Sequence, residues 1–329
     1  MEHFKEAYFK PGKPLIIRGG FPDCPARGWD LEYLNQKVGQ NVVNIRKNTN
    51  TDSYKLGKKY NIEKIELKKY LDLLISGSKQ SSQYYLAACN IKFEFPQISD
   101  EFVVPPFIQK IHHGPFLWVS APQHYEFCHV DADDGILCMI SGLKKVKLFS
   151  PTYFKNLYPN DLGSLGRTVQ SRVNLDNPDL VQFPNLKDVI CEEGSLYPGD
   201  LLFIPGFYWH QVTSVESSIS INIFYGDNGE NNYIEKLISS RLEVFLYWLI
   251  NILQQNEALL QKDVFPELHE IIKVFLKYQF KEDANDEQVG ILVKHVMQHY
   301  NLTELPPFLG NKRKNPKRLK IRGLLFRDK

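Results

Sequence analysis

Three side chains of the sequence have the types and spacing of a metal site. His129 and Asp131 are separated by one residue in the segment HYEFCHVDADDGILCMISGLKKVKLFSP. Because side chains alternate between the two faces of a β-strand, this spacing places the imidazole and the carboxylate on one face. His210 follows a second apolar run, in GDLLFIPGFYWHQV. Two imidazoles and one carboxylate form the ligand set that holds ferrous iron and leaves positions open for an oxygen-activating reaction.

The HxD pair has another interpretation, since it also occurs as a surface ion pair or as part of a turn. Lys144, which follows a turn at Gly142, adds a further polar group to the same segment. A lysine buried beside a metal would need an anion to offset its lost hydration. A dicarboxylate co-substrate, whose other end chelates the metal, would supply that anion. Alternatively, a lysine within KKVK is typical of a solvated strand.

The segments around these residues predict a β-rich core. From residue 116 to residue 225, short apolar runs alternate with Gly, Pro, Asn and Asp. This texture favours an antiparallel barrel or sandwich. Pro205 and Gly206 would bend the chain ahead of His210, so that the imidazole enters the interior.

The flanking regions predict helices, mixed with strands before the core. Residues 29–39 place apolar side chains at spacings of three and four, and a similar pattern recurs over residues 62–77. Helical patterns return after residue 231. The chain therefore divides into four regions. An N-terminal α/β region (1–100) packs on the core (101–230), and a helical C-terminal extension (231–310) and a tail (311–329) follow.

The composition indicates a globular intracellular protein. The chain has 329 residues, of which 43% are hydrophobic and 24% charged, enough to bury a large core. The apolar run VFLYWLINIL, over residues 244–253, is shorter than the roughly 18 residues of a membrane span, so we expect a buried or dimer-facing helix and no membrane association. Five cysteines without CxxC spacing indicate reduced thiols, and the N-terminus shows no secretory signal. We expect the cytoplasm or the nucleus.

The charge is unevenly distributed along the chain. Residues 311–329 contain nine Lys or Arg and one Asp, a local charge of +8, so the remainder carries about −6 of the net +2. Such a basic tail binds nucleic acid, serves as a nuclear address or touches an anionic surface. The alternative is a solvated terminus.

Five motifs between about residues 118 and 225 carry a family resemblance. HVD, SGLKKVKLFSP, NLDNPDLVQFP, GDLLFIPGFYWH and SINIF resemble, in order and spacing, the JmjC or cupin-like Fe(II)- and 2-oxoglutarate-dependent oxygenases. The likeness is to the small members without chromatin-reader domains, such as the factor-inhibiting-HIF asparaginyl hydroxylase, the JmjC-only protein hydroxylases and the tRNA wybutosine hydroxylase. The resemblance implies a mainly β protein with α elements, built on a double-stranded β-helix of the jelly-roll or cupin type.

The resemblance also implies roles for particular residues. His129, Asp131 and His210 would be the catalytic iron ligands. Lys144 would pair with the distal carboxylate of 2-oxoglutarate, and Asn222, in SINIF, would lie beside this co-substrate. The cofactor would be Fe(II), with 2-oxoglutarate and O2 as co-substrates and succinate as a product.

Two positions depart from the asparaginyl hydroxylase. Glu126 stands three residues before His129, where that enzyme has a hydroxyl residue that contacts 2-oxoglutarate, and Gly135 stands where it has an asparagine. A carboxylate facing the anionic co-substrate would weaken its binding. We therefore expect that Glu126 turns away, or that Tyr125 or another hydroxyl takes the contact with 2-oxoglutarate.

The leading functional hypothesis is hydroxylation of a side chain in a protein substrate, because most small JmjC-only relatives act on proteins. The C-terminal helices resemble the dimer-forming extension of the asparaginyl hydroxylase, so we expect a homodimer. An alternative is a tRNA hydroxylase whose basic tail neutralises phosphates. A third hypothesis is a catalytically silent binding module that keeps the barrel as a scaffold. Histone demethylation is the least supported, because no reader domain or zinc cluster accompanies the core.

Overall fold

The chain divides into two compact units in the computed structural model. One unit comprises Met1–Asn160 and Thr168–Asn228, and the other comprises Asp161–Arg167 and Gly229–Lys329. The N-terminal region and the β-rich core thus belong to one unit. The structure describes the following residues: 2–56, 60–108, 111–159, 168–225, 233–240, 242, 245–246, 249–250, 268–280 and 283–299.

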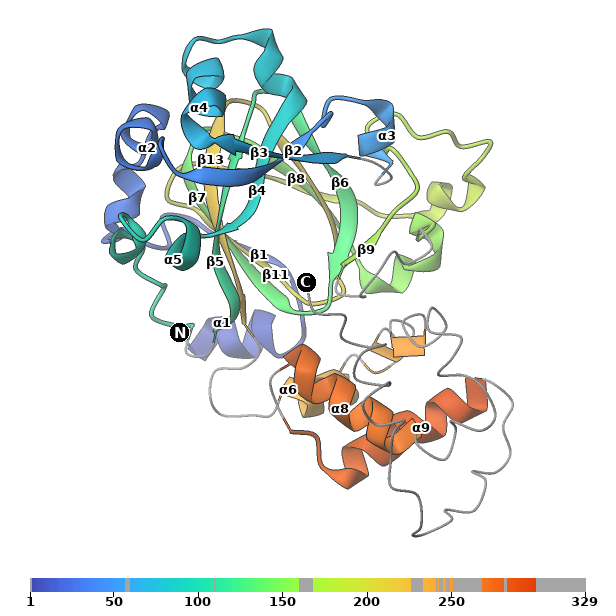
Figure 1. Cartoon of the computed structure of the whole chain (residues 1–329). Coiled ribbons are helices and arrows are strands. Elements are labelled where there is room, and N and C mark those ends of the chain that lie inside the picture. The colour runs from blue at the N-terminus through green and yellow to red at the C-terminus, as the bar shows by residue number, and fades with distance from the viewer. Residues whose placement is uncertain are drawn as a thin grey trace, which may run out of the picture. The chain divides into compact units, whose positions relative to one another are not determined.

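Antiparallel strands form the core of the first unit (Figure 1). They are β5 (Ile111–Ser120), β6 (His124–Asp131), β7 (Asp134–Ser141), β8 (Lys144–Phe149), β10 (Glu192–Leu196), β11 (Leu201–Ile204), β12 (Trp209–Ser214) and β13 (Ser218–Tyr225). Within the larger sheet the order is β11-β7-β13-β5, and within the smaller sheet it is β10-β8-β12-β6. All pairs are antiparallel. Two four-stranded sheets with this crossing order make a jelly roll, as predicted.

The N-terminal region extends the larger sheet on both sides. Strand β1 (Leu15–Ile17) pairs with β11, and β4 (Tyr84–Asn90), β2 (Val42–Lys47) and β3 (Asn61–Glu66) follow β5 in that order. On the smaller sheet, β9 (Thr168–Gln170) pairs with β6. The larger sheet therefore has eight strands and the smaller sheet five.

The two longer helices of the N-terminal region lie in segments where the spacing of apolar residues predicts helices. Helix α2 (Leu31–Val38) begins after Asp30, whose carboxylate accepts a hydrogen bond from the backbone N–H of Tyr33 at 2.7 Å. The predicted helix over residues 62–77 is wrong in its first part: β3 occupies residues 61–66, and helix α4 (Leu67–Ile75) begins only after it. Six register pairs with β2 fix this segment as a strand, so tertiary pairing overrides the helical pattern.

Shorter helices complete the first unit. These are α1 (Glu2–Phe4), η1 (Lys5–Phe9), η2 (Pro25–Gly28), α3 (Asp52–Lys55), η3 (Lys79–Gln83), α5 (Ile91–Glu94), η4 (Ser99–Glu101), η5 (Pro151–Tyr153), η6 (Lys155–Leu157) and η7 (Pro184–Asp188). Only α3 contributes a side chain to the site described below.

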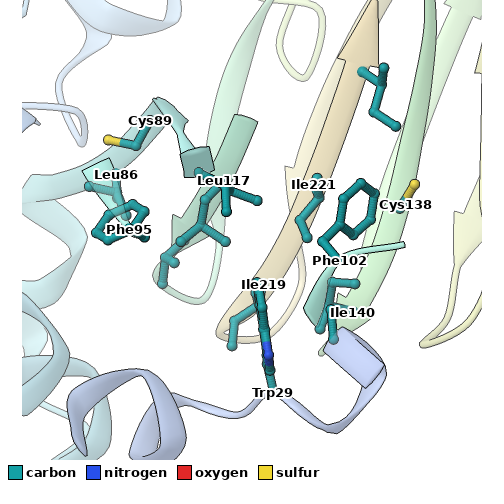
Figure 2. Packing of buried hydrophobic residues seen from close by; sticks show 14 of the residues in the cluster. Trp29, Leu86, Cys89, Phe95, Phe102, Leu117, Cys138, Ile140, Ile219 and Ile221 are labelled. Carbon is teal, nitrogen blue, oxygen red and sulfur yellow. The ribbon is translucent and has the colours of Figure 1, made fainter. Parts of the chain in front are cut away.

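Two apolar layers lie on the two faces of the larger sheet. The outer layer joins this sheet to the N-terminal helices and includes Trp29, Phe95, Leu117 and Ile221. Figure 2 shows these side chains among the buried hydrophobic residues of this layer. The inner layer lies between the sheets and consists of Leu137, Met139, Val146, Leu148, Leu196, Leu202 and Tyr208. The space between the sheets is thus apolar along part of its length, which lowers the dielectric around any charge placed there.

The second unit contains helices α6 (Tyr233–Ser240), α8 (Leu268–Phe280) and α9 (Asp286–His299) among its described residues. Lys273 of α8 and Asp286 at the start of α9 form an ion pair at 2.7 Å. Across the described parts of the chain, no helix is long and apolar enough to cross a membrane. The basic tail and most of the predicted dimer-facing helix over residues 244–253 lie outside the described residues.

Candidate metal centre

The interior face of the smaller sheet carries three successive rows of paired residues. Directly paired residues of antiparallel strands point to the same face, so the register of β12 with β6 and β8 fixes each row. The first row contains Lys144, Ser214 and His124, the second row contains Val146, Val212 and Glu126, and the third row contains Leu148, His210 and His129. A molecule that reaches from the third row to the first must pass the second.

A β-bulge in β6 determines which side chains enter this interior. The register shifts between His210 and Val212 of β12, which pair with His129 and Glu126 of β6. Two residues of β6 thus oppose one residue of β12, and the alternation of faces is reset at this point. Glu126 consequently shares the interior face with His129, although two residues separate them in sequence and regular alternation would place them on opposite faces.

The three candidate metal ligands meet at the third row. Nε2 of His129 and Nε2 of His210 each lie 3.7 Å from Oδ2 of Asp131, and one ligand atom from each side chain lies within 4.8 Å of the others. Two atoms that are each about 2.1 Å from one ion can be at most about 4.2 Å apart, so both histidine–aspartate distances fit a shared ion. Among the residues that the structure describes, no other trio of this kind is found.

Backbone carbonyls fix the orientation of both imidazoles. Nδ1 of His129 lies 2.8 Å from the carbonyl oxygen of Phe127, and Nδ1 of His210 lies 3.0 Å from that of Tyr208. Because a carbonyl oxygen can only accept, each Nδ1 is the protonated donor, which in the neutral imidazole leaves the lone pair on Nε2. This hydrogen bonding is typical of histidines that ligate metals.

Burial keeps His210 in the neutral form that a metal requires. Burial and the neighbouring His129 lower the pKa of His210 to about 4, against the opposing effect of Asp131. At neutral pH the Nε2 lone pair is therefore not occupied by a proton. The donor set, the distances and the protonation state all fit an Fe(II) ion held by His129, Asp131 and His210.

A tight turn before β12 delivers His210 to the site. The backbone N–H of Phe207 donates to the carbonyl of Asp131, and that of Gly206 donates to Oδ1 of Asp134, both at 2.7 Å. Phe207 has a φ of 65°, in the left-handed region that costs energy for a residue with a side chain. These two hydrogen bonds hold the bend predicted at Pro205 and Gly206 against that cost.

Replacing Asp134 by alanine is expected to weaken metal binding by about 10- to 100-fold, as is typical for groups that orient metal ligands. Isothermal titration of the protein with Mn(II) measures this loss. Asp176→Ala is the matched control, because that carboxylate pairs instead with Lys147 at 3.0 Å. We expect the control to keep its affinity within about twofold, and an unchanged affinity in Asp134→Ala would contradict this role.

Lys144 lies in the first row as a buried ammonium hydrogen-bonded to a neutral side chain. Its side chain crosses to the larger sheet, where Nζ donates to the hydroxyl of Ser220 at 2.7 Å. Lys144 is only 3% exposed, and within the described part of the chain no carboxylate lies within ion-pair distance of it. Burial lowers its pKa to about 8, although Glu126 acts in the opposite direction. A buried cation with so little compensation favours the entry of an anion.

Asn222 and Tyr125 have different surroundings. Asn222 is buried on the same face of β13 as Ser220, and its Oδ1 accepts a hydrogen bond from Nε1 of Trp118 at 2.6 Å. Tyr125 pairs with Thr213 and so points to the opposite face of the smaller sheet, where its hydroxyl accepts from the backbone N–H of Leu175 at 3.3 Å. The structure therefore gathers Asn222 with the other predicted site residues but not Tyr125.

A buried polar network holds Glu126, and sequence reasoning missed its partners. Oε1 of Glu126 accepts from Arg46 at 2.9 Å, Oε2 accepts from the hydroxyl of Tyr54 at 2.6 Å, and Nε2 of His124 lies 3.6 Å from Oε2. Burial alone would raise the pKa of Glu126, but Arg46 and His124 lower it well below its usual range. Arg46 and Tyr54 are 80 and 72 residues away in sequence, so no local signal points to them.

Comparison with known proteins agrees with this geometry. Lysine-specific demethylase 8 of Danio rerio is 29% identical over 239 residues, 68% of this chain and 56% of the relative. JmjC domain-containing protein D of Dictyostelium discoideum is 30% identical over 243 residues, 67% of this chain and 53% of the relative. tRNA wybutosine-synthesizing protein 5 of Homo sapiens is 27% identical over 244 residues, 68% of this chain and 74% of the relative. The chain thus spans little more than half the length of the first two relatives.

The cupin-like domain family matches residues 1–231, well over half of the chain. The chain therefore belongs to the cupin-like family, in its JmjC branch of iron- and 2-oxoglutarate-type oxygenases. This confirms the predicted family and its jelly-roll core.

Proposed function

We propose that this protein binds Fe(II) at His129, Asp131 and His210, binds 2-oxoglutarate against Lys144, and hydroxylates a side chain in a protein substrate. The observation that carries the proposal is the placement of the triad and the buried ammonium on one interior face, two rows apart. A five-carbon dicarboxylate has an anionic group at each end, so it suits a pocket with a metal at one end and a cation at the other.

Each residue of the site has a distinct task. The two histidines present fixed Nε2 lone pairs, and Asp131 supplies the anionic ligand. Lys144 orients the distal carboxylate, and the apolar layer between the sheets excludes water. When bound together, Fe(II) and 2-oxoglutarate supply the activation of O2 that oxidises a C–H bond of the substrate. The amide of Asn222, held by Trp118 at 2.6 Å, is suited to a contact beside the co-substrate.

The affinity for 2-oxoglutarate is expected to fall by about tenfold per pH unit above pH 8. Burial lowers the pKa of Lys144 to about 8, and a bound carboxylate favours its protonated form, so binding is strongest below this pH. Equilibrium titration between pH 7 and 9.5 measures the effect. Lys144→Arg is the control, since a guanidinium stays protonated throughout. An affinity in the wild type that stays constant to pH 9.5 would contradict the role of Lys144.

A protein substrate is supported by the relatives whose printed name is lysine-specific demethylase. Hydroxylation of a carbon and oxidation of an N-methyl group begin at the same kind of C–H bond, but only the second releases formaldehyde. The test is to incubate the Fe(II)-loaded protein and 2-oxoglutarate with a peptide library and to analyse the products by mass spectrometry. We expect a peptide product with one added oxygen atom and no formaldehyde. Release of formaldehyde would contradict hydroxylation and indicate demethylation instead.

A tRNA substrate is the second candidate, because the human tRNA wybutosine-synthesizing protein 5 is matched over 74% of its length. The basic tail, with a local charge of +8, suits phosphate contacts. Deletion of residues 311–329 separates the two candidates. If tRNA is the substrate, the full chain binds tRNA with an affinity that falls as salt is added, and the truncated chain loses this binding. Peptide turnover that is unaffected by the deletion favours the protein substrate.

A further inference from the structure

The second interior row contains a negative charge where the proposed co-substrate must pass. Glu126 is 6% exposed and lies between the row of Lys144 and the row of His129 and His210. A bare carboxylate at this position would repel a dicarboxylate that spans the pocket. The pocket therefore needs a way to accommodate Glu126 that does not use Lys144.

Arg46 and Tyr54 provide this accommodation from outside the jelly roll. Arg46 lies on β2 and Tyr54 on α3, both in the N-terminal region. Each donates to a different carboxylate oxygen of Glu126, and Nη1 of Arg46 also lies 3.1 Å from the hydroxyl of Tyr54. Both acceptor oxygens are thus directed at the N-terminal region, and the charge of the carboxylate is balanced by a guanidinium.

Aromatic rings hold Arg46 in place. The guanidinium carbon lies 4.6 Å from the ring centroid of Tyr60, 5.7 Å from that of Tyr85 and 5.8 Å from that of Phe127. The side chains of Arg46 and Glu126 are 15% and 8% exposed, so water screens their attraction poorly. The pair is consequently a fixed feature of the pocket wall.

We propose that Arg46 is a positioning residue for the co-substrate site: it neutralises Glu126 and holds its carboxylate toward the N-terminal region, so that Lys144 remains available to a dicarboxylate. The inference rests on the proposed function. It assigns to the N-terminal region a direct part in co-substrate affinity, and it explains how a chain with a carboxylate at this position retains an anion site.

Opposite effects of two single substitutions test the proposal. Arg46→Met leaves an unbalanced carboxylate in the pocket and is expected to weaken 2-oxoglutarate binding by about tenfold or more. Glu126→Gln removes the negative charge and is expected to leave the affinity unchanged or raise it. Titration of the Mn(II)-loaded full chain with 2-oxoglutarate, without turnover, measures both affinities. In a separate titration, the affinity for Mn(II) should change by less than about twofold in each variant.

The double variant Arg46→Met/Glu126→Gln keeps the test valid if Arg46→Met folds poorly. Its 2-oxoglutarate affinity is expected to return to within about threefold of the wild type, because neither charge remains. A purely structural pair would instead weaken binding in both single variants and in the double variant, which would overturn the proposal. Unchanged binding in Arg46→Met would overturn it as well. Absence of 2-oxoglutarate binding by the wild type would reject the proposed function itself, and this inference with it.

Discussion

His210→Ala is expected to abolish tight metal binding and to reduce 2-oxoglutarate turnover by at least about 100-fold. In the proposed site His210 supplies one of three ligands, and its Nε2 lies 3.7 Å from Oδ2 of Asp131. Alanine removes the imidazole that the carbonyl of Tyr208 holds in position. Mn(II) titration and Fe(II)-dependent succinate formation measure the two losses independently.

His295→Ala is the matched control for this substitution. Nδ1 of His295 also lies 2.8 Å from a backbone carbonyl oxygen, that of Ile291, but the residue belongs to α9 in the second unit. The control should keep the metal affinity and turnover of the wild type. A His210→Ala variant that still binds Mn(II) with wild-type affinity would show that the ion is held elsewhere.

Lys144→Met is expected to weaken 2-oxoglutarate binding by about 100-fold or more while leaving metal affinity intact. Removing one partner of a buried ion pair costs about 3–5 kcal/mol, and in the complex the distal carboxylate would lose its only cation at this end. The same substitution should stabilise the ligand-free protein, because an apolar side chain replaces a buried ammonium that donates to the neutral hydroxyl of Ser220. Binding titrations and chemical unfolding measure these opposite effects.

Lys147→Met is the control on the same strand. Lys147 points to the other face of β8 and pairs with Asp176 at 3.0 Å, an exposed ion pair that contributes about 0–1 kcal/mol. Neither its 2-oxoglutarate affinity nor its stability should change appreciably. If Lys144→Met bound 2-oxoglutarate as tightly as the wild type, another group would have to receive the distal carboxylate.

Two of the three candidate metal ligands could be predicted together from the sequence because their spacing within one strand is local. The spacing of His129 and Asp131 places them on one face of a strand, and the apolar run ahead of His210 predicts a second buried strand. The structure brings these three side chains within 4.8 Å of one another. Lys144 is also interior, although its own KKVK context equally favours a solvated strand.

The surroundings of the triad could not be predicted, because one extra residue in β6 shifts the alternation of side chains between the two faces of the sheet. Counting by twos from His129 leads back to Tyr125 and excludes Glu126, which makes Tyr125 the natural candidate for a co-substrate contact. The bulge in β6 reverses this assignment: Glu126 pairs with Val212 on the interior face, and Tyr125 pairs with Thr213 on the other. A bulge has no signature in the segment HYEFCHVD, so the sequence cannot reveal the exchange.

Long-range pairing explains the remaining differences. Arg46 and Tyr54 reach Glu126 because β2 belongs to the extension of the larger sheet and α3 packs against β6, which brings segments more than 70 residues apart into contact. The strand over residues 61–66 forms because β2 offers a pairing edge. In both cases the partner lies outside the segment whose own pattern was used for the prediction.

The most direct test of the account is the Fe(II)-dependent conversion of 2-oxoglutarate to succinate by the wild-type chain, measured beside His129→Ala and Lys144→Met. We predict succinate formation by the wild type that depends on added Fe(II), and its loss in both variants. A wild-type protein that binds iron but forms no succinate under any condition would contradict the account and would indicate a scaffold that only binds.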